Sequence, residues 1–290
     1  MDYQEFAQVL NKHIFYGNKR ELLDKLASNP ERFIGLFRPS KPSTKILQHL
    51  LQSYEIRMGD ALEEIIGLVI QDQGYILLDK NIQGDNNELL RLDQYFTDGK
   101  KYYFIEQKIR DDHDSTKKRG QMQNFEKKLK VLHRKHGSNL VGIMYFIDPD
   151  FSKNKNYYQE EIQTLRGEYE QVELHLFYGK QLFEYLGIAN LWDEMLSWLK
   201  KWKEDLPEIP ETNFDANPYE SFMEIKDINV RIWQKIISND KLWEEGIIKA
   251  LFRTGDTLKL IHEEFSKMEG KVYKRLASDL KEKLVKYYVV

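Results

Sequence analysis

Cysteine is absent from the 290-residue chain, and proline and glycine are scarce, at 7 and 16 residues. Without thiols the chain cannot form disulfides, zinc–thiolate sites or iron–sulfur clusters, and it has no cysteine nucleophile. The scarcity of proline and glycine, with aromatic and aliphatic residues spread throughout, argues against disorder. We therefore expect one sizeable core, or one core with a smaller helical domain.

Long apolar runs are missing too, since none approaches the roughly twenty residues that cross a bilayer. The N-terminus carries Asp2 and Glu5 where a secretory signal would have an apolar segment. Phosphate-binding glycine loops, the Gly-x-Ser-x-Gly elbow and paired-histidine zinc spacings are also absent. These absences predict a soluble intracellular protein, and they leave nucleotide-dependent, serine-hydrolase and histidine-ligated zinc chemistry without a motif in the sequence.

One strongly basic segment stands out in a chain of net charge −3. Residues 100–135 contain 12 Lys and Arg residues against 5 Asp and Glu residues. Such a segment could present one face to a polyanion such as nucleic acid, or it could be a solvated helix face.

The period of the apolar residues changes along the chain from that of helices to that of strands and back. We expect helices at 43–51, 60–72, 121–135, 180–186 and 191–202, and strands at 75–78, 88–96, 101–109, 140–147 and 172–178. This order predicts an α/β fold with a mixed central β-sheet flanked by helices, followed by a C-terminal all-helical region.

A linker is expected at 205–220, which holds three of the seven prolines and many acidic residues. It would separate residues 1–204, the N-terminal helices plus a catalytic domain, from the helical residues 221–290. The helical part shows breaks near Asn239, Gly255 and Gly270. It could be a helix-turn-helix module that contacts DNA, or a plain cap or dimerisation bundle.

A predicted hairpin brings three charged residues onto one face. If the Asp-Gly pair at 98–99 forms a two-residue loop, Asp93 lies opposite Phe104. Glu106 is then the diagonal neighbour of Asp93 on the same face, and Lys108 follows one step along the strand. Diagonal neighbours lie about 7–8 Å apart at the backbone and closer at the side chains, so these two carboxylates can share one metal ion.

The chemistry of these residues suggests phosphodiester hydrolysis. Carboxylate oxygens select Mg²⁺ or Mn²⁺, which lowers the pKa of a bound water and stabilises charge on an attacked phosphate. A lysine beside the metal can orient the nucleophile or stabilise the transition state. Glu-x-Lys alone is common in so charged a chain. The preceding apolar run at 102–105 and the following basic segment favour a site over surface charges.

Leu92-Asp93 and Phe104-Ile105-Glu106-Gln107-Lys108 resemble the Asp…Glu-x-Lys signature of the PD-(D/E)XK nuclease superfamily. The order of helix, three strands, helix and strand over residues 55–185 is also similar to that superfamily's core, with Leu92 where the motif name has proline. Within it the chain looks most like a type II restriction endonuclease. The resemblance implies a Mg²⁺ cofactor, sequence-specific cleavage of double-stranded DNA, a homodimer, and the cytoplasm of a prokaryote.

The resemblance also implies an additional acid on the helix before the first strand. We select Glu63, with Glu64 as the rival because one sequence cannot set the helical phase. The expected metal ligands are then Asp93, Glu106 and Glu63, with Lys108 assisting the attacking water. A repair or junction-resolving nuclease on the same core, or a DNA-binding module without catalysis, remains the alternative.

The segment after the catalytic strand is expected to be an irregular loop that contacts DNA. Lys117, Lys118 and Arg119 could bind backbone phosphates. The resemblance suggests that Gln121, or Gln123, faces the site from the first turn of the next helix. The acids at 111–114 could bind a second metal or pair with the neighbouring basic side chains.

Overall fold

The computed structural model describes residues 1–35, 37 and 39–288. The chain divides into two compact units. The sheet unit comprises Met1–His13 and Met58–Leu206, and the helical unit comprises Ile14–Arg57 and Pro207–Val290. The last boundary between the two units along the chain falls between Leu206 and Pro207. Residues 14–57 cluster with the C-terminal helices rather than with the sheet.

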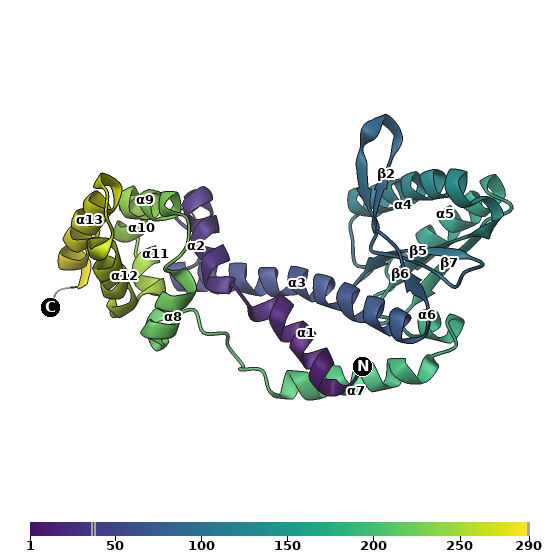
Figure 1. The fold of residues 1–290 in the computed structure, drawn as a ribbon, viewed down its shortest axis with the longest axis horizontal. Helices are drawn as coiled ribbons and strands as arrows, with labels where there is room; N and C mark the ends of the chain where they lie inside the picture. The colour runs from purple at the N-terminus through teal and green to yellow at the C-terminus, as the bar shows by residue number, and fades with distance from the viewer. Residues whose placement is uncertain (36, 38, 289–290) are drawn as a thin grey trace. The chain divides into compact units, whose positions relative to one another are not determined.

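Helices and strands follow the α/β order expected from the sequence (Figure 1). The α-helices are α1 (Tyr3–Phe15), α2 (Asn18–Ser28), α3 (Pro42–Asp72), α4 (Ser115–His136), α5 (Lys155–Glu168), α6 (Lys180–Tyr185), α7 (Ala189–Glu204), α8 (Pro218–Ile225), α9 (Val230–Ser238), α10 (Asp240–Glu244), α11 (Ile247–Leu251), α12 (Asp256–Lys267) and α13 (Lys271–Tyr288). The strands are β1 (Ile76–Leu77), β2 (Asn81–Gln83), β3 (Leu89–Arg91), β4 (Gln94–Thr97), β5 (Tyr102–Lys108), β6 (Leu140–Phe146) and β7 (Glu173–Tyr178). Within the described residues no helix combines the length and apolarity needed to cross a membrane.

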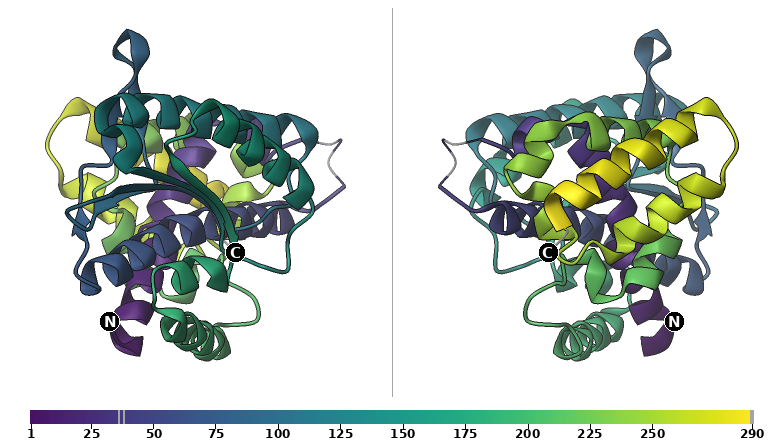
Figure 2. Two further views of the ribbon diagram at one scale, coloured as in Figure 1. Left: turned by 90° about the vertical axis from the view of Figure 1, so that its right-hand side faces the viewer. Right: turned by 90° about the vertical axis from the view of Figure 1, so that its left-hand side faces the viewer.

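The central sheet is mixed, as predicted, with strand order β1-β4-β5-β6-β7. The β1–β4 and β4–β5 pairs are antiparallel, whereas β5, β6 and β7 are parallel. Helices α4 and α5 cover one face, and the C-terminal half of α3 lies along the other (Figures 1 and 2). Every residue of β6 is buried, because helices cover both faces of the sheet. This burial explains why the strand is a continuous apolar run rather than an alternating one.

Two predicted helices, 43–51 and 60–72, are wrong as separate elements, because α3 is continuous from Pro42 to Asp72. Gly59, which immediately precedes the second predicted helix, lies inside α3, where glycine is tolerated at a modest cost. The apolar spacing continues in phase across it, with Ile46 and Leu50 buried before it and Ala61 and Ile65 buried after it.

The predicted strand 88–96 is also wrong as one element, because the chain changes partner within it. Strand β3 pairs with β2 in a separate two-stranded ribbon, and β4 pairs with β1 and β5. The change falls at Leu92 and Asp93, where the Leu92 amide donates to the Lys80 carbonyl at 2.8 Å. Strand β2 was missed because it contains only three residues.

The β4–β5 hairpin has a different register from the predicted one. Thr97 pairs with Tyr102 rather than Lys100, so the loop has four residues instead of two. Asp98 selects this loop, because its Oδ1 accepts the amides of Lys100 at 2.8 Å and Lys101 at 2.7 Å. The register therefore moves by two residues, which leaves every side chain on its predicted face.

The helical unit has its own core, built from α2, the start of α3 and helices α8 to α13. Asp215 begins α12 by accepting the amides of Thr254, Gly255 and Thr257 at 2.8 to 2.9 Å. Gly255 has φ 80°, and a Cβ there would meet the Tyr288 ring at 2.8 Å. Figure 2 (right) shows α13, in yellow, lying across this unit. The helix breaks expected near 239, 255 and 270 are confirmed.

Strand β6 supplies a stability test, since a Cβ on Gly142 would lie 2.7 Å from Phe104 and 2.8 Å from Leu174. Gly142→Ala should lower the free energy of unfolding by about 1–3 kcal/mol, because both neighbours are fixed in the core. Gly167→Ala, in α5 where nothing lies within 4 Å, is the control and should raise it by about 0.5–1 kcal/mol. Urea denaturation of both variants measures the difference, and equal stabilities would contradict this packing.

Candidate active site

Three residues predicted to act together do meet at the end of β5. Lys108 Nζ lies 3.0 Å from Asp93 Oδ2 and 2.9 Å from Glu106 Oε1. The Gln107 amide donates to the same Asp93 oxygen at 2.7 Å, which holds the carboxylate against the strand. Asp93 was expected opposite Phe104, but Phe104 pairs with Tyr95. The two-residue register shift brings Asp93 level with the end of β5 and preserves the shared face.

Glu106 is the most enclosed member of this group. Its side chain is 3% exposed, against 21% for Asp93 and 28% for Lys108. Glu106 Oε1 accepts from Lys108 and, at 3.2 Å, from Asn124 Nδ2, while Oε2 accepts from Lys128 Nζ at 2.5 Å. Both carboxylate oxygens therefore accept hydrogen bonds, which offset the cost of burying the charge.

Lys128 and Asn124 were not predicted from the sequence, yet the position of Lys128 among the apolar residues of its helix could have identified it. It lies at helical spacing from Phe125, Leu129 and Leu132, which are all buried, so it belongs to the core-facing side of α4. A lysine on that side requires an acidic partner, because an unpaired buried ammonium is very costly. The structure supplies that partner as Glu106.

The charges of the site balance, with two carboxylates beside two ammonium groups. Burial acts to lower the pKa of Lys108, but its ion pairs with Glu106 and Asp93 outweigh burial and raise that pKa above the ordinary lysine value. Lys108 is therefore cationic near neutral pH. The acidic oxygens of Asp93 and Glu106 are the hard donors that suit Mg²⁺. The partial exposure of Asp93 leaves one side open to solvent.

Glu63 lies on the sheet side of α3, and Glu64 does not. Glu63 pairs with Lys80 at 2.7 Å and Arg91 at 3.3 Å, and its backbone carbonyl accepts from Gln94 at 2.7 Å. Glu64 instead contacts His13 at 2.5 Å, on α1. No group of three or more His, Asp or Glu side chains that could hold a metal occurs among the described residues. Glu63 therefore does not join Asp93 and Glu106 in such a group, and its role as a ligand stays a prediction.

The helix after β5 begins earlier in the chain than residue 121, where it was predicted to begin. Helix α4 begins at Ser115, capped by Asp114, whose Oδ1 accepts the amides of Thr116 at 3.0 Å and Lys117 at 2.8 Å. These hydrogen bonds, that from Lys117 first, hold the pKa of Asp114 below its usual value. Asp114 is therefore the N-cap residue of α4. The residues predicted to bind phosphate thus occupy the first turns of α4, and among them Lys117 and Arg119 are exposed.

Two further polar candidates are buried. Gln121 is 9% exposed and accepts from the Tyr158 hydroxyl at 2.6 Å, so in this arrangement its side chain is not accessible to a nucleic acid. Asp111 is 0% exposed and accepts from Asn154 at 2.9 Å and from the Tyr178 hydroxyl at 3.0 Å. Those contacts make Asp111 an anchor for the loop between β5 and α4.

Comparison with known proteins identifies a family. The model of the HinfI type II restriction endonuclease family matches residues 2–91 and 75–203, two overlapping segments that together cover most of the chain. The match contains Asp93, Glu106, Lys108 and Lys128. No curated protein matches the chain.

The buried pair of Glu106 and Lys128 can be tested by stability. Lys128→Met should lower the free energy of unfolding by about 3 kcal/mol, because it leaves a buried carboxylate short of a counter-ion. Lys127→Met is the control, since Lys127 pairs with Glu88 and both are about half exposed, and it should cost less than about 1 kcal/mol.

The double variant Glu106→Gln/Lys128→Met should recover at least half of that loss, because it removes both charges. Denaturant titrations of the four proteins complete the cycle. Additive losses in the double variant would show that the pair is not coupled.

Proposed function

Because the chain belongs to the HinfI family of type II restriction endonucleases, we propose that it is a Mg²⁺-dependent enzyme that cuts double-stranded DNA at one short sequence. The observation that carries the proposal is Lys108, held between the carboxylates of Asp93 and Glu106 at the end of β5. This grouping on a mixed sheet supports assignment to the PD-(D/E)XK type of nuclease.

Asp93 and Glu106 would hold the metal. When bound, Mg²⁺ lowers the pKa of a coordinated water and neutralises charge on the scissile phosphate. Lys128 and Asn124 fix the rotamer of Glu106 from the α4 side, so the ligand is oriented before substrate arrives. Glu63 is the proposed auxiliary acid, and it would have to exchange its contacts with Lys80 and Arg91 for the metal.

Lys108 is proposed to act on the reacting groups. Its ammonium lies within 3.0 Å of both carboxylates, so it is next to the residues that would hold the metal. A fixed positive charge there stabilises the charge that develops on phosphorus-bound oxygens as the bond breaks. Its raised pKa keeps it protonated for that role at neutral pH.

The start of α4 is proposed to bind DNA phosphates through Lys117, Lys118 and Arg119. Basic side chains gathered in the first turns of a helix supply the positive charge that DNA phosphates require. Only the loop at 109–114 separates these residues from β5, so the phosphates would be close to the scissile bond. We further propose a homodimer, with one site for each strand of the duplex, in the cytoplasm of a prokaryote.

Digestion of plasmid DNA with and without Mg²⁺, followed by sequencing of the ends, tests the proposed function. We expect discrete fragments with one common terminal sequence, and only when Mg²⁺ is present. Asp93→Ala and Glu106→Ala should each reduce the cleavage rate by at least about a hundredfold while duplex binding in Ca²⁺ persists. The control is Asp193→Ala, an exposed acid that pairs with Lys180. Near-normal cleavage by either site variant would refute the assignment.

The role of the basic segment can be read from salt dependence. Replacing Lys117, Lys118 and Arg119 together by alanine should flatten the slope of log affinity against log salt by about two to three, at about 0.9 per phosphate contact. Cognate and random duplexes should weaken alike, because phosphates carry no sequence. Alanine at Lys200, Lys201 and Lys203, on α7, provides a control of equal charge. Anisotropy titrations in Ca²⁺ at several salt concentrations measure the slopes. An unchanged slope would show that these three side chains are solvated surface charges that do not contact DNA phosphates.

A further inference from the structure

The β2–β3 ribbon has one buried face and one exposed face. Asn81 pairs with Arg91, Ile82 with Leu90, and Gln83 with Leu89. Ile82 and Leu90 are 8% and 5% exposed and pack into the core beneath α4. Since side chains alternate along a strand, the other four residues form the exposed face.

That exposed face has the chemistry of base recognition. It carries two amides from Asn81 and Gln83, a guanidinium from Arg91, and Leu89, whose side chain is 71% exposed. In the major groove, amides pair with adenine, arginine pairs with guanine, and apolar side chains contact the methyl group of thymine. Nothing in the packing of the ribbon requires a leucine in solvent, because Ile82 and Leu90 already anchor it.

The ribbon is also held firmly to α4. Asp85, at its turn, pairs with Arg134 at 2.6 Å, and Glu88 pairs with Lys127. Across the turn, Gln83 Nε2 donates to Asn87 Oδ1 at 2.9 Å, which orients the Gln83 amide. Placement by ion pairs and a buried apolar face lowers the entropy that binding would otherwise cost.

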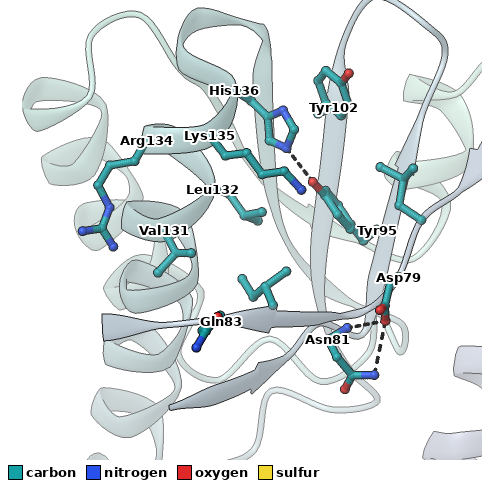
Figure 3. A pocket seen from close by; sticks show the side chains of 12 residues that line it. Asp79, Asn81, Gln83, Tyr95, Tyr102, Val131, Leu132, Arg134, Lys135 and His136 are labelled. Carbon is teal, nitrogen blue, oxygen red and sulfur yellow. Dashed lines mark hydrogen bonds between the residues drawn. The ribbon is translucent and has the colours of Figure 1, made fainter. Parts of the chain in front are cut away.

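A hollow of about 790 Å³ borders the ribbon and has basic side chains along one side (Figure 3). Asn81 and Gln83 line it from the ribbon, and Arg134, Lys135 and His136 line it from the end of α4. The His136 ring stacks on Tyr102 with a centroid distance of 3.8 Å and is 2.5 Å from the Tyr95 hydroxyl. The cationic groups of Arg134 and Lys135, beside a groove-reading element, match the phosphates that flank the groove.

The ribbon is continuous in sequence with the proposed catalytic acid. Only Leu92 separates Arg91 from Asp93, and Leu89 is four residues from Asp93. At no more than about 3.3 Å per residue, Leu89 lies at most about 13 Å from Asp93 along the chain. At about 3.4 Å per base pair, this reach covers roughly four base pairs.

We propose that the exposed face of the β2–β3 ribbon enters the major groove and reads base edges within a few base pairs of the cut, through Gln83, Leu89 and Arg91. A two-stranded ribbon is an element that the major groove of B-DNA can accommodate. The inference rests on the proposed function, because it assigns the specificity of the same enzyme.

Gln83→Ala and Leu89→Ala test the proposal with little risk to the fold, since both side chains are exposed and the anchors Ile82 and Leu90 are unchanged. Binding is measured in Ca²⁺ to the duplex that the wild type cuts and to a random duplex. Cognate affinity should fall about tenfold for Gln83→Ala and about fourfold for Leu89→Ala, with random-duplex affinity unchanged. Gln73→Ala, an exposed amide outside the ribbon, should alter neither affinity.

Base analogues identify the contacts in the cognate duplex. Uracil in place of one thymine removes the methyl group and should weaken wild-type binding about fourfold, but should not weaken Leu89→Ala further. 7-Deazaadenine at one adenine should weaken wild-type binding but not Gln83→Ala, because the amide has lost its N7 partner.

Two outcomes would overturn the proposal, and they differ from failure of the proposed function. If the wild type cuts at one sequence but both variants keep wild-type discrimination and analogue sensitivity, the ribbon does not read bases. If cognate and random binding fall together in the variants, the ribbon contacts phosphates instead. If the wild type yields no fragments with Mg²⁺, the proposed function itself fails, and the inference fails with it.

Discussion

The buried carboxylate of Glu106 is the constraint on which the sheet unit depends. A 3% exposed charge must be matched at both oxygens, and the match comes from two directions, from Lys108 along β5 and from Lys128 on α4. Helix α4 therefore has to pack with one particular turn over the end of β5. This requirement joins the stability of the sheet to the geometry of the site, because the same contacts that offset burial also orient a proposed metal ligand.

The first turns, the middle and the last turns of helix α4 each make different contacts. Its first turns carry exposed basic side chains over the positive end of the helix dipole. Its middle inserts Lys128 beside Glu106. Its last turns fix the β2–β3 ribbon through Arg134 and line the hollow beside it. One rigid element thus places the proposed phosphate contacts, metal ligand and base-reading ribbon at defined spacings.

Several parts of the site were predictable because they follow from local rules. The Asp-Gly turn and the alternation of β5 placed Asp93, Glu106 and Lys108 on one face, and the grouping survived a register error of two residues because that shift preserves the face. An error of one residue would have dispersed them. The choice between Glu63 and Glu64 required the phase of α3, which contacts with Lys80 on one side and His13 on the other decide.

By itself the sequence determined the α/β class, the mixed sheet, the helical C-terminal region and the acidic–basic trio, since all of these depend on periodicity and short-range spacing. Tertiary structure alone decided the Lys128 contact, the separation of β3 from β4, the burial of Gln121 and the grouping of residues 14–57 with the C-terminal helices. The physical reason is distance along the chain. Each of these features depends on which remote segment supplies a partner for a buried charge, an edge strand or an apolar face. Local pattern shows that such a partner is needed without showing which one it is.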